Sequence, residues 1–313
     1  MIQQALMALA VAIAGVFGQS ALQPDAPIKC SSCDEWNRAI EPFRVYGSTY
    51  YVGTDGLSAL LITSDQGHIL LDGGLSQSAP LIDANIHKLG FKLEDVKLIL
   101  NSHAHYDHAA GIAALQRASG ATVVSSASGA EGFAAGNAVP DDPQAGFGKV
   151  DNAFPPVKNV RVVKDKDIVT VGPLAVQMHN TAGHTPGSTT WTWQSCEAPA
   201  ASSSPKPQAP SRCLNMVYAD SISAVAAPGF RFTGDAKTPS RVDQFRKSIT
   251  TVGELPCDVM ITTHPMATDL AGKLKKRAAK PAVDPFIDPQ ACRVLAANAM
   301  KALDARVAEE QKK

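Results

Sequence analysis

The sequence predicts an α/β fold in which two β-sheets pack as a sandwich covered by helices. Short β-branched, aromatic and aliphatic runs, separated by Gly and Asp, fill the region from about residue 43 to 100. A second series of such runs follows after residue 160, and apolar residues at helical spacing accompany both series. Two strand-rich halves of this kind bury their apolar faces when the sheets pack together and the helices lie outside.

The first half contains four predicted strands before the run Asp72-Gly73-Gly74 stops the last of them. A helix is predicted over 79–89 from apolar residues at helical spacing. The run VKLIL at 96–100 predicts a buried strand. The four earlier strands are predicted at 43–47, 49–54, 58–63 and 68–71.

The second half repeats this plan, with two outer helices and two long loops. The run EAPAASSSPKPQAPSR at 197–212 is rich in Ala, Ser and Pro, and we expect it to be a mobile surface insertion. A second loop is predicted over 132–158. The strands of this half are predicted at 160–163, 168–171, 174–179, 188–193, 216–219 and 258–263, and the helices at 241–252 and 289–310.

The N-terminus has the pattern of an export signal. An apolar run from Ala5 to Phe17 is too short to span a bilayer, and small residues follow at Gly18 and Ser20. We expect residues 1–20 to be a signal peptide cleaved near 18 or 20, which places the protein in the periplasm or outside the cell. A retained anchor or a buried helix is the alternative, because the first four residues hold no Lys or Arg.

Residues 21–313 are predicted to form a single domain. Hydrophobic residues make up 45% and charged residues 19% of the 313-residue chain, which is typical of a globular protein. The formal net charge is zero and the pI is about 7.1, so nothing indicates a nucleic-acid or anionic membrane partner. We therefore expect a small-molecule partner, no membrane span and a monomer.

Six cysteines behind an export signal allow disulfides. We favour two bridges, Cys196 with Cys213 and Cys257 with Cys292. The first would pinch the 197–212 insertion into a surface excursion. Cys30 and Cys33 allow either a local bridge or half of a redox or zinc motif.

The run HAHYDH at 103–108 predicts a metal site. Residues two apart point the same way in an extended segment, so His103 and His105 can bind one ion. Asp107 and His108 would then turn toward a second. Imidazole and carboxylate ligands suit zinc, and three protein ligands per ion leave a position for water, as in catalytic sites. The alternative is a polar loop that is His-rich by chance, which a total of only eight histidines disfavours.

His184 and His264 are the further candidate ligands. His184 lies in the turn TAGHTPG after a predicted strand, and His264 ends another predicted strand just before a proline. Both occupy strand-to-loop junctions, as the HAHYDH run does. His179 is expected to be a core histidine or to lie behind the ligands, whereas His68 and His87 are expected at the surface.

These motifs resemble those of the metallo-β-lactamase superfamily. The resemblance rests on LDGG at 71–74, HAHYDH at 103–108, GHTPGS at 183–188 and the lone His264, and it extends from about Trp36 to the C-terminal helix. Within the superfamily, the chain resembles class B β-lactamases of subclass 3. The run DSIS at 220–223 has serine where other subclasses have a cysteine ligand.

The resemblance implies an αβ/βα sandwich with the site in a groove along one edge. It further implies that Ser221 and Ser223 bind the substrate carboxylate and that Cys257 pairs with Cys292. The implied cofactor is two zinc ions, one held by His103, His105 and His184 and the other by Asp107, His108 and His264.

The implied activity is zinc-dependent hydrolysis of the β-lactam amide bond of penicillins, cephalosporins or carbapenems. A water shared by two zinc ions has a pKa low enough to give hydroxide near neutral pH. Asp107 would orient this hydroxide and accept its proton. An acyl-serine mechanism lacks its nucleophile, because the chain has no G-x-S-x-G run.

Two other functions are compatible with the motif. Relatives that hydrolyse thioesters or lactones use an additional aspartate to bridge the metals, and Asp220 lies close to that position in the sequence. The ADS context of Asp220 and the export signal favour the β-lactamase. A zinc-storage module is the non-enzymatic alternative, and it would close its coordination instead of leaving a position open. The groove is expected to be lined by residues among Trp36, Gln144, Phe147 and Phe230.

Overall fold

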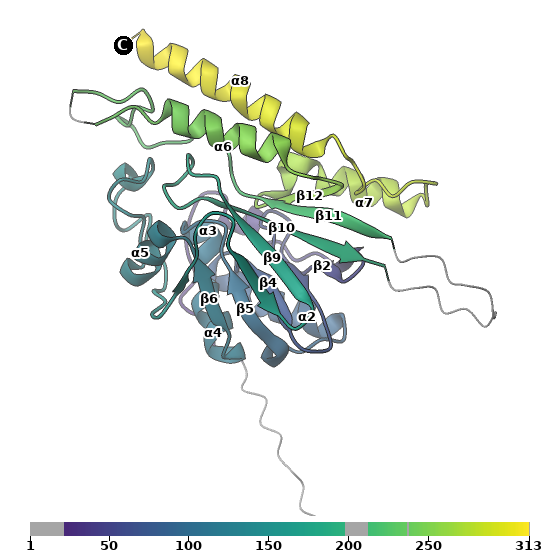
Figure 1. Cartoon of the computed structure of the whole chain (residues 1–313). Helices are drawn as coiled ribbons and strands as arrows, with labels where there is room; N and C mark the ends of the chain where they lie inside the picture. The colour runs from purple at the N-terminus through teal and green to yellow at the C-terminus, as the bar shows by residue number, and fades with distance from the viewer. Residues whose placement is uncertain (1–21, 198–211, 237, 313) are drawn as a thin grey trace, which may run out of the picture.

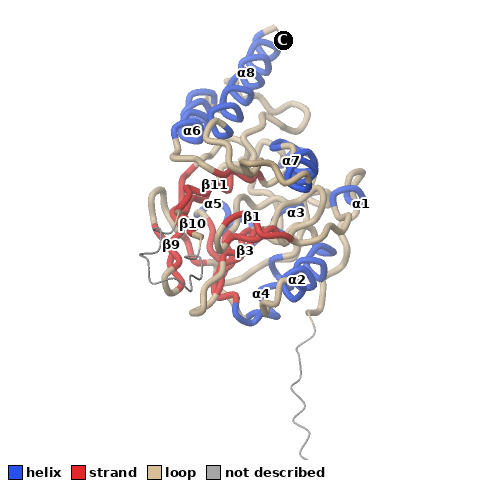
Figure 2. The backbone as a smooth tube through the Cα atoms, turned by 90° about the vertical axis from the view of Figure 1, so that its right-hand side faces the viewer, coloured by secondary structure: helices blue, strands red, loops and turns tan. Residues whose placement is uncertain are grey.

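The protein, described by a computed structural model over residues 22–197, 212–236 and 238–312, has four layers (Figure 1). Two sheets pack face to face, and helices lie on the outer face of each, as Figure 2 also shows. The predicted αβ/βα sandwich is therefore confirmed. The predicted signal peptide and nearly all of the 197–212 insertion lie outside the described residues. Within those residues, no helix is both long and apolar enough to cross a membrane.

The first sheet has seven strands in chain order, β1 to β7. Its first four strands pair antiparallel, and β4 to β7 pair parallel. The strands are β1 (Phe43–Tyr46), β2 (Thr49–Tyr51), β3 (Leu60–Ile62), β4 (His68–Leu71), β5 (Val96–Leu100), β6 (Thr122–Ser125) and β7 (Arg161–Val162).

The second sheet has five strands in the order β12-β11-β10-β9-β8. Only β11 and β12 pair parallel, and the other neighbours are antiparallel. The strands are β8 (Ile168–Val171), β9 (Leu174–Asn180), β10 (Thr189–Cys196), β11 (Cys213–Ala219) and β12 (Val259–Thr262).

Helices α2 and α4 cover the first sheet, and α6 and α8 lie side by side over the second (Figure 1). The α-helices are α1 (Cys33–Trp36), α2 (Ala79–Lys88), α3 (Tyr106–Ala109), α4 (Ile112–Ser119), α5 (Ala127–Ala135), α6 (Val242–Glu254), α7 (Leu270–Ala278) and α8 (Ala291–Gln311), and the 3-10 helices are η1 (Ser76–Ser78), η2 (Leu93–Asp95), η3 (Ala145–Phe147) and η4 (Pro265–Thr268).

Three apolar clusters separate the four layers, because successive strand residues point to opposite faces. In β11, Met216 and Tyr218 lie between the two sheets, whereas Val217 and Ala219 face α6 and α8. Full burial of a side chain such as Met216 or Val217 stabilises the fold by about 1.5–3 kcal/mol. The central strands are therefore buried on both sides and hold the ends of their loops rigidly.

Several sequence predictions are corrected. Strand β7 belongs to the first sheet and not to the second series, because it pairs parallel with β6. Helix α5 takes up the first residues of the predicted 132–158 loop, since Ser126 caps its start and Gly136, at φ 62°, ends it. His68, expected at the surface, is only 6% exposed because it begins the central strand β4 and packs against Phe91.

All three cysteine pairs are bridged, including the local pair. Cys196 and Cys213 face each other across β10 and β11, at the end of the hairpin where the 197–212 insertion departs. Cys257 and Cys292 join the loop before β12 to the start of α8. The two favoured bridges are thus confirmed.

Candidate metal centre and active site

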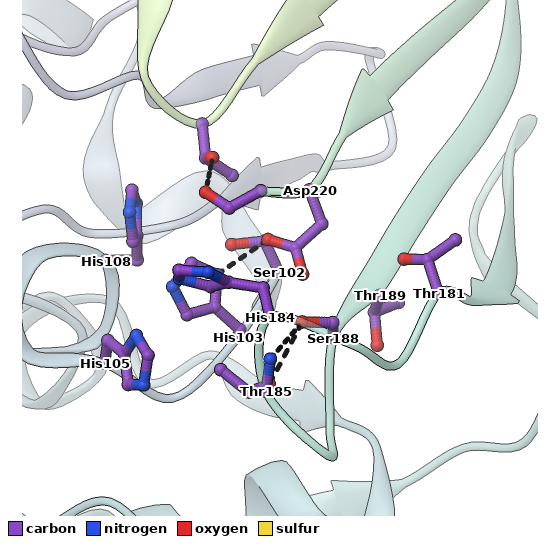
Figure 3. A network of polar contacts seen from close by, with 12 residues as sticks. Ser102, His103, His105, His108, Thr181, His184, Thr185, Ser188, Thr189 and Asp220 are labelled. Carbon is purple, nitrogen blue, oxygen red and sulfur yellow. Dashed lines mark hydrogen bonds and ion pairs between the residues drawn. The ribbon is translucent and has the colours of Figure 1, made fainter. Parts of the chain in front are cut away.

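The six predicted ligands converge at one edge of the sandwich. The HAHYDH run follows β5, His264 follows β12, and His184 lies in the turn between β9 and β10. The two sheets meet here, because Thr189 N donates to Ser102 O at 2.8 Å. Strand ends of an α/β sheet are the usual position for a site, and Figure 3 shows the imidazoles of His103, His105, His108 and His184 gathered there.

His103, His105 and His184 form the first group. Their candidate ligand atoms lie within 4.8 Å of one another, and all three side chains are buried. The rings of His103 and His184 are 4.9 Å apart between centroids, and those of His105 and His184 are 5.1 Å apart. The three rings therefore enclose a common point.

Each of these rings is held from behind by an acceptor. Such hydrogen bonds fix which ring nitrogen carries the proton and leave the other nitrogen free to bind a metal. The Asp220 contact is drawn in Figure 3. His103 Nδ1 donates to Asp220 Oδ1 at 2.6 Å, His105 Nε2 donates to Asp142 at 3.1 Å, and His184 Nδ1 donates to Ser223 O at 3.0 Å.

His103 Nε2 fits a metal ligand for a separate reason. This nitrogen is buried and has no hydrogen-bond partner among the described residues. A buried polar atom without a partner costs free energy, and a metal ion at the centre of the group would remove that cost. The first group therefore fits a metal ion.

Asp107, His108 and His264 form the second group, and their atoms are evenly spaced. Asp107 Oδ2 lies 3.3 Å from His108 Nε2 and 3.3 Å from His264 Nε2, and these two nitrogens are themselves 3.3 Å apart. Ligands about 2.0–2.1 Å from a tetrahedral zinc ion are about 3.3–3.4 Å from one another. The triangle therefore fits one face of a tetrahedral zinc site. His264 Nδ1 is held from behind by Gly56 O at 3.4 Å.

The charges of the site favour a cation. Burial disfavours ionisation of Asp107, but His108 and His264 outweigh it and hold the pKa of its carboxyl well below its usual range. Burial also disfavours protonation of His108, but Asp107, Asp72 and Asp220 outweigh it and raise its pKa to about 9. Burial, with His103 and His105 nearby, lowers the pKa of His184 to about 3. The imidazole of His184 is thus neutral, whereas the ionised carboxylate of Asp107 attracts positive charge to the second group.

Asp72 fixes the start of the HAHYDH run through hydrogen bonds to Ser102. It has φ 58° and accepts hydrogen bonds from Ser102 N at 2.8 Å, Ser102 Oγ at 2.6 Å and Tyr218 OH at 2.9 Å. Burial raises the pKa of its carboxyl to about 6, although Ser102 and His108 oppose this. The aspartate of the LDGG motif therefore ties β4 to the residue that precedes His103.

Comparisons with known proteins decide the family. A profile of the metallo-β-lactamase superfamily matches residues 52–197. The structure of Rm3 metallo-β-lactamase is 49% identical, with a TM-score of 0.82, over 90% of this chain and 99% of that one. The chain belongs to the metallo-β-lactamase family.

Two further relatives narrow the assignment. MEM-A1, a subclass B3 metallo-β-lactamase from a soil metagenome library, is 46% identical, with a TM-score of 0.79, over 88% of this chain and 99% of that one. Metallo-β-lactamase SMB-1, in a complex with mercaptoacetic acid, is 42% identical, with a TM-score of 0.78 and the same coverage. The resemblance to subclass B3 is therefore confirmed.

A cavity of about 610 Å³ opens beside the ligands of this metallo-β-lactamase. Ser221 and Ser223 line it, as do the predicted groove residues Trp36 and Gln144. Phe147 and Phe230 do not line it: Phe147 is 43% exposed, whereas Phe230 packs edge-on against Phe232. Space next to the ligands is what a catalytic site needs and a storage site lacks.

Several residues of the site were not predicted from the sequence, among them Asp142, Asn152 and Gly56. Asp142 lies in a loop without any pattern, and only its position behind His105 reveals its role. Asn152, in the same loop, lines the cavity. Gly56 contributes a backbone oxygen, and any side chain there would collide with Trp36, since an added Cβ would lie 2.6 Å from its Cα. His179 lies outside both groups, on β9.

Proposed function

We propose that this chain is an exported, monomeric zinc-dependent β-lactamase that hydrolyses the β-lactam amide bond of antibiotics. The even 3.3 Å triangle of Asp107, His108 and His264, beside an open cavity, is the observation that carries the proposal. In this proposal the second zinc ion is held by that triangle. The first is held by His103, His105 and His184.

The residues of the chain position the substrate and move one proton. Zinc bound here would supply a water of lowered pKa and polarise the amide carbonyl. Asp107, ionised at neutral pH, lines the cavity and accepts the proton of the attacking water. Ser221 and Ser223 offer hydroxyl groups to the substrate carboxylate from the same cavity wall.

The thioester or lactone hydrolase requires Asp220 to bridge two metals. Asp220 Oδ1 instead accepts from His103 Nδ1, on the opposite side of that ring from the unpartnered Nε2. The carboxylate thus stands behind a ligand, which supports the β-lactamase over this alternative. For Oδ1 to bind a metal, it would have to leave this contact of 2.6 Å.

The test compares two substrates on the same preparation. We expect two zinc ions per chain by metal analysis and rapid hydrolysis of a chromogenic cephalosporin, which a chelator abolishes. A glutathione thioester should be a poor substrate. Because SMB-1 is known in a complex with mercaptoacetic acid, this thiol is a second probe and should inhibit. Hydrolysis of the thioester alone, or full activity with one zinc ion, would overturn the proposal.

Export is proposed from the sequence and supported by the cysteines. Three bridged pairs fit an oxidising compartment such as the periplasm. The monomeric state is likewise proposed from the sequence. Cell fractionation and light scattering of the mature protein test these two points.

A further inference from the structure

The cavity continues beyond the metal groups into an apolar region. We call this region the apolar trough and define it by Val225, Met266, Leu295, Ala299 and Ala302, all of which line the cavity. Val225 is 50% and Met266 is 64% exposed. Large apolar side chains with this exposure, inside a concave site, offer surface to an apolar ligand group.

Helix α8 forms the far wall of the trough. Leu295, Ala299 and Ala302 recur at helical spacing, so they share one face of α8. The neighbouring stripe of this helix, which includes Cys292 and Leu303, packs in the cluster beneath α6, and Leu295 and Ala299 also pack partly against that cluster. Ala302, which is exposed and outside that cluster, is therefore the wall residue that α8 does not need for its packing.

The wall is fixed at both ends. The Cys257–Cys292 bridge anchors the first turn of α8. Near the other end, Glu310 accepts from Thr233 N at 2.9 Å and from Phe232 N at 3.1 Å. A wall anchored in this way keeps its distance from the site, so the size of its side chains determines how much room the trough has.

The trough begins beside the serines. Ser221 Oγ lies 2.9 Å from Thr263 Oγ1, so the segment after β11 and the segment after β12 meet there. Val225 follows in the first segment and Met266 in the second, and both line the cavity together with the α8 residues of the trough. A substrate whose carboxylate is held by Ser221 and Ser223 therefore has the trough next to that carboxylate.

We propose that the apolar trough is a subsite for an apolar substituent adjacent to the substrate carboxylate, with α8 as its specificity-determining wall. This inference rests on the proposed β-lactamase function. In a cephalosporin the group on the carbon next to the carboxylate-bearing carbon is the C-3 substituent. The trough accordingly selects cephalosporins with a large, apolar C-3 group, and Ala299 and Ala302 leave the room for it.

The experiment uses the zinc-loaded full enzyme and a matched pair of cephalosporins. Both carry the same thienylacetyl group at C-7, and they differ only in a dinitrostyryl or a methyl group at C-3. Ala302→Leu and Ala299→Leu put a larger side chain on the wall while retaining a good helix former. Each should lower kcat/KM for the dinitrostyryl substrate about tenfold, and for the methyl substrate less than about twofold.

Ala297→Leu is the control, because Ala297 is an exposed residue of the same helix outside the cavity lining. It should leave the ratio of the two kcat/KM values unchanged. Zinc content and thermal unfolding, measured on every variant, identify one that is misfolded. An unchanged ratio in well-folded Ala302→Leu and Ala299→Leu would overturn the subsite. Hydrolysis of neither substrate by the parent enzyme would instead overturn the β-lactamase function itself.

Discussion

Asp220 Oδ1 lies 2.6 Å from Nδ1 of His103, and both side chains are completely shielded from solvent. Burial raises the pKa of the Asp220 carboxyl, although His184 and other neighbours oppose this. A carboxylate in such surroundings orients the imidazole and increases its basicity toward a metal. This single contact therefore distinguishes the two hydrolase functions. Asp220 would hold His103 in the β-lactamase and would bridge the two metals in the thioester or lactone hydrolase.

The first prediction concerns that contact. Asp220→Asn keeps an oxygen that can face His103 Nδ1, so it should retain two zinc ions when zinc is saturating. Asp220→Ala removes the acceptor and should weaken binding of one zinc ion by about 10–100-fold. Titration with a chromogenic chelator measures both. Loss of a zinc ion from Asp220→Asn at saturating zinc would instead indicate that Asp220 is a bridging ligand.

The second prediction concerns the substrate carboxylate. Ser221→Ala should raise KM for β-lactams about tenfold and change kcat little, because the contact exists in both the bound substrate and the transition state. Steady-state kinetics on a penicillin provide the measurement. With an esterified substrate, which lacks the charge, parent and variant should have the same KM. An effect of equal size on the ester would argue against carboxylate binding.

The third prediction concerns the bridge at the start of α8. Cys257→Ser or Cys292→Ser should lower the free energy of unfolding by about 2–5 kcal/mol and leave the zinc content unchanged. Denaturant unfolding of the oxidised protein measures this. The double variant Cys257→Ser/Cys292→Ser should lose as much, since it removes the same bridge. Free thiols at both positions in the exported protein would refute the pairing.

The fourth prediction concerns His179, which is 4% exposed in β9. Its Nδ1 accepts from Lys166 Nζ at 3.0 Å and its Nε2 donates to Thr192 Oγ1 at 2.7 Å. Burial, followed by the charge of Lys166, lowers the pKa of His179 to about 4. The unfolded chain takes up a proton near pH 6.5 and the folded chain only near pH 4, so the free energy of unfolding should fall as the pH drops from about 6.5 to about 4.

His179→Gln should make this decline shallower. The control is Gln194→Ala, which changes an exposed, uncharged residue of the neighbouring strand β10 and should keep the pH profile of the parent. Thermal unfolding between pH 4 and 7 measures both. A variant with the same pH dependence as the parent would show that His179 does not contribute to it.

The six candidate metal ligands could be selected from the sequence because residue type and spacing are specific to metal binding, and the structure brings these side chains together. Strands β4 and β5 are also found at the predicted residues, since their apolar runs are bounded by Gly, Asp and charged residues. The hydrogen-bond acceptors that orient the histidine rings of these candidate ligands could not be predicted in this way. Asp142 is 37 residues from His105, and only tertiary folding makes them neighbours.

The burial of a residue and the sheet to which a short strand belongs also could not be predicted from local sequence patterns. A two-residue strand such as β7 carries too little periodicity to show which sheet it joins. His68 is polar, so its pattern indicated solvent, although the two-sided burial of β4 decides its environment. Helix α4 was not predicted, although its apolar residues, which include Ile112 and Leu115, have the spacing of an amphipathic helix.

The hairpin of β10 and β11 has one further consequence, for engineering. At one end, Thr189 and Asp220 adjoin the metal groups, and at the other, the Cys196–Cys213 bridge closes the strands where residues 198–211 depart. Eight residues of strand separate the two ends, a distance of about 25 Å. The Cys196–Cys213 disulfide would separate a fluorophore, affinity tag or surface tether inserted at the bridged end from the active site. This metallo-β-lactamase thus has its own attachment point, remote from substrate.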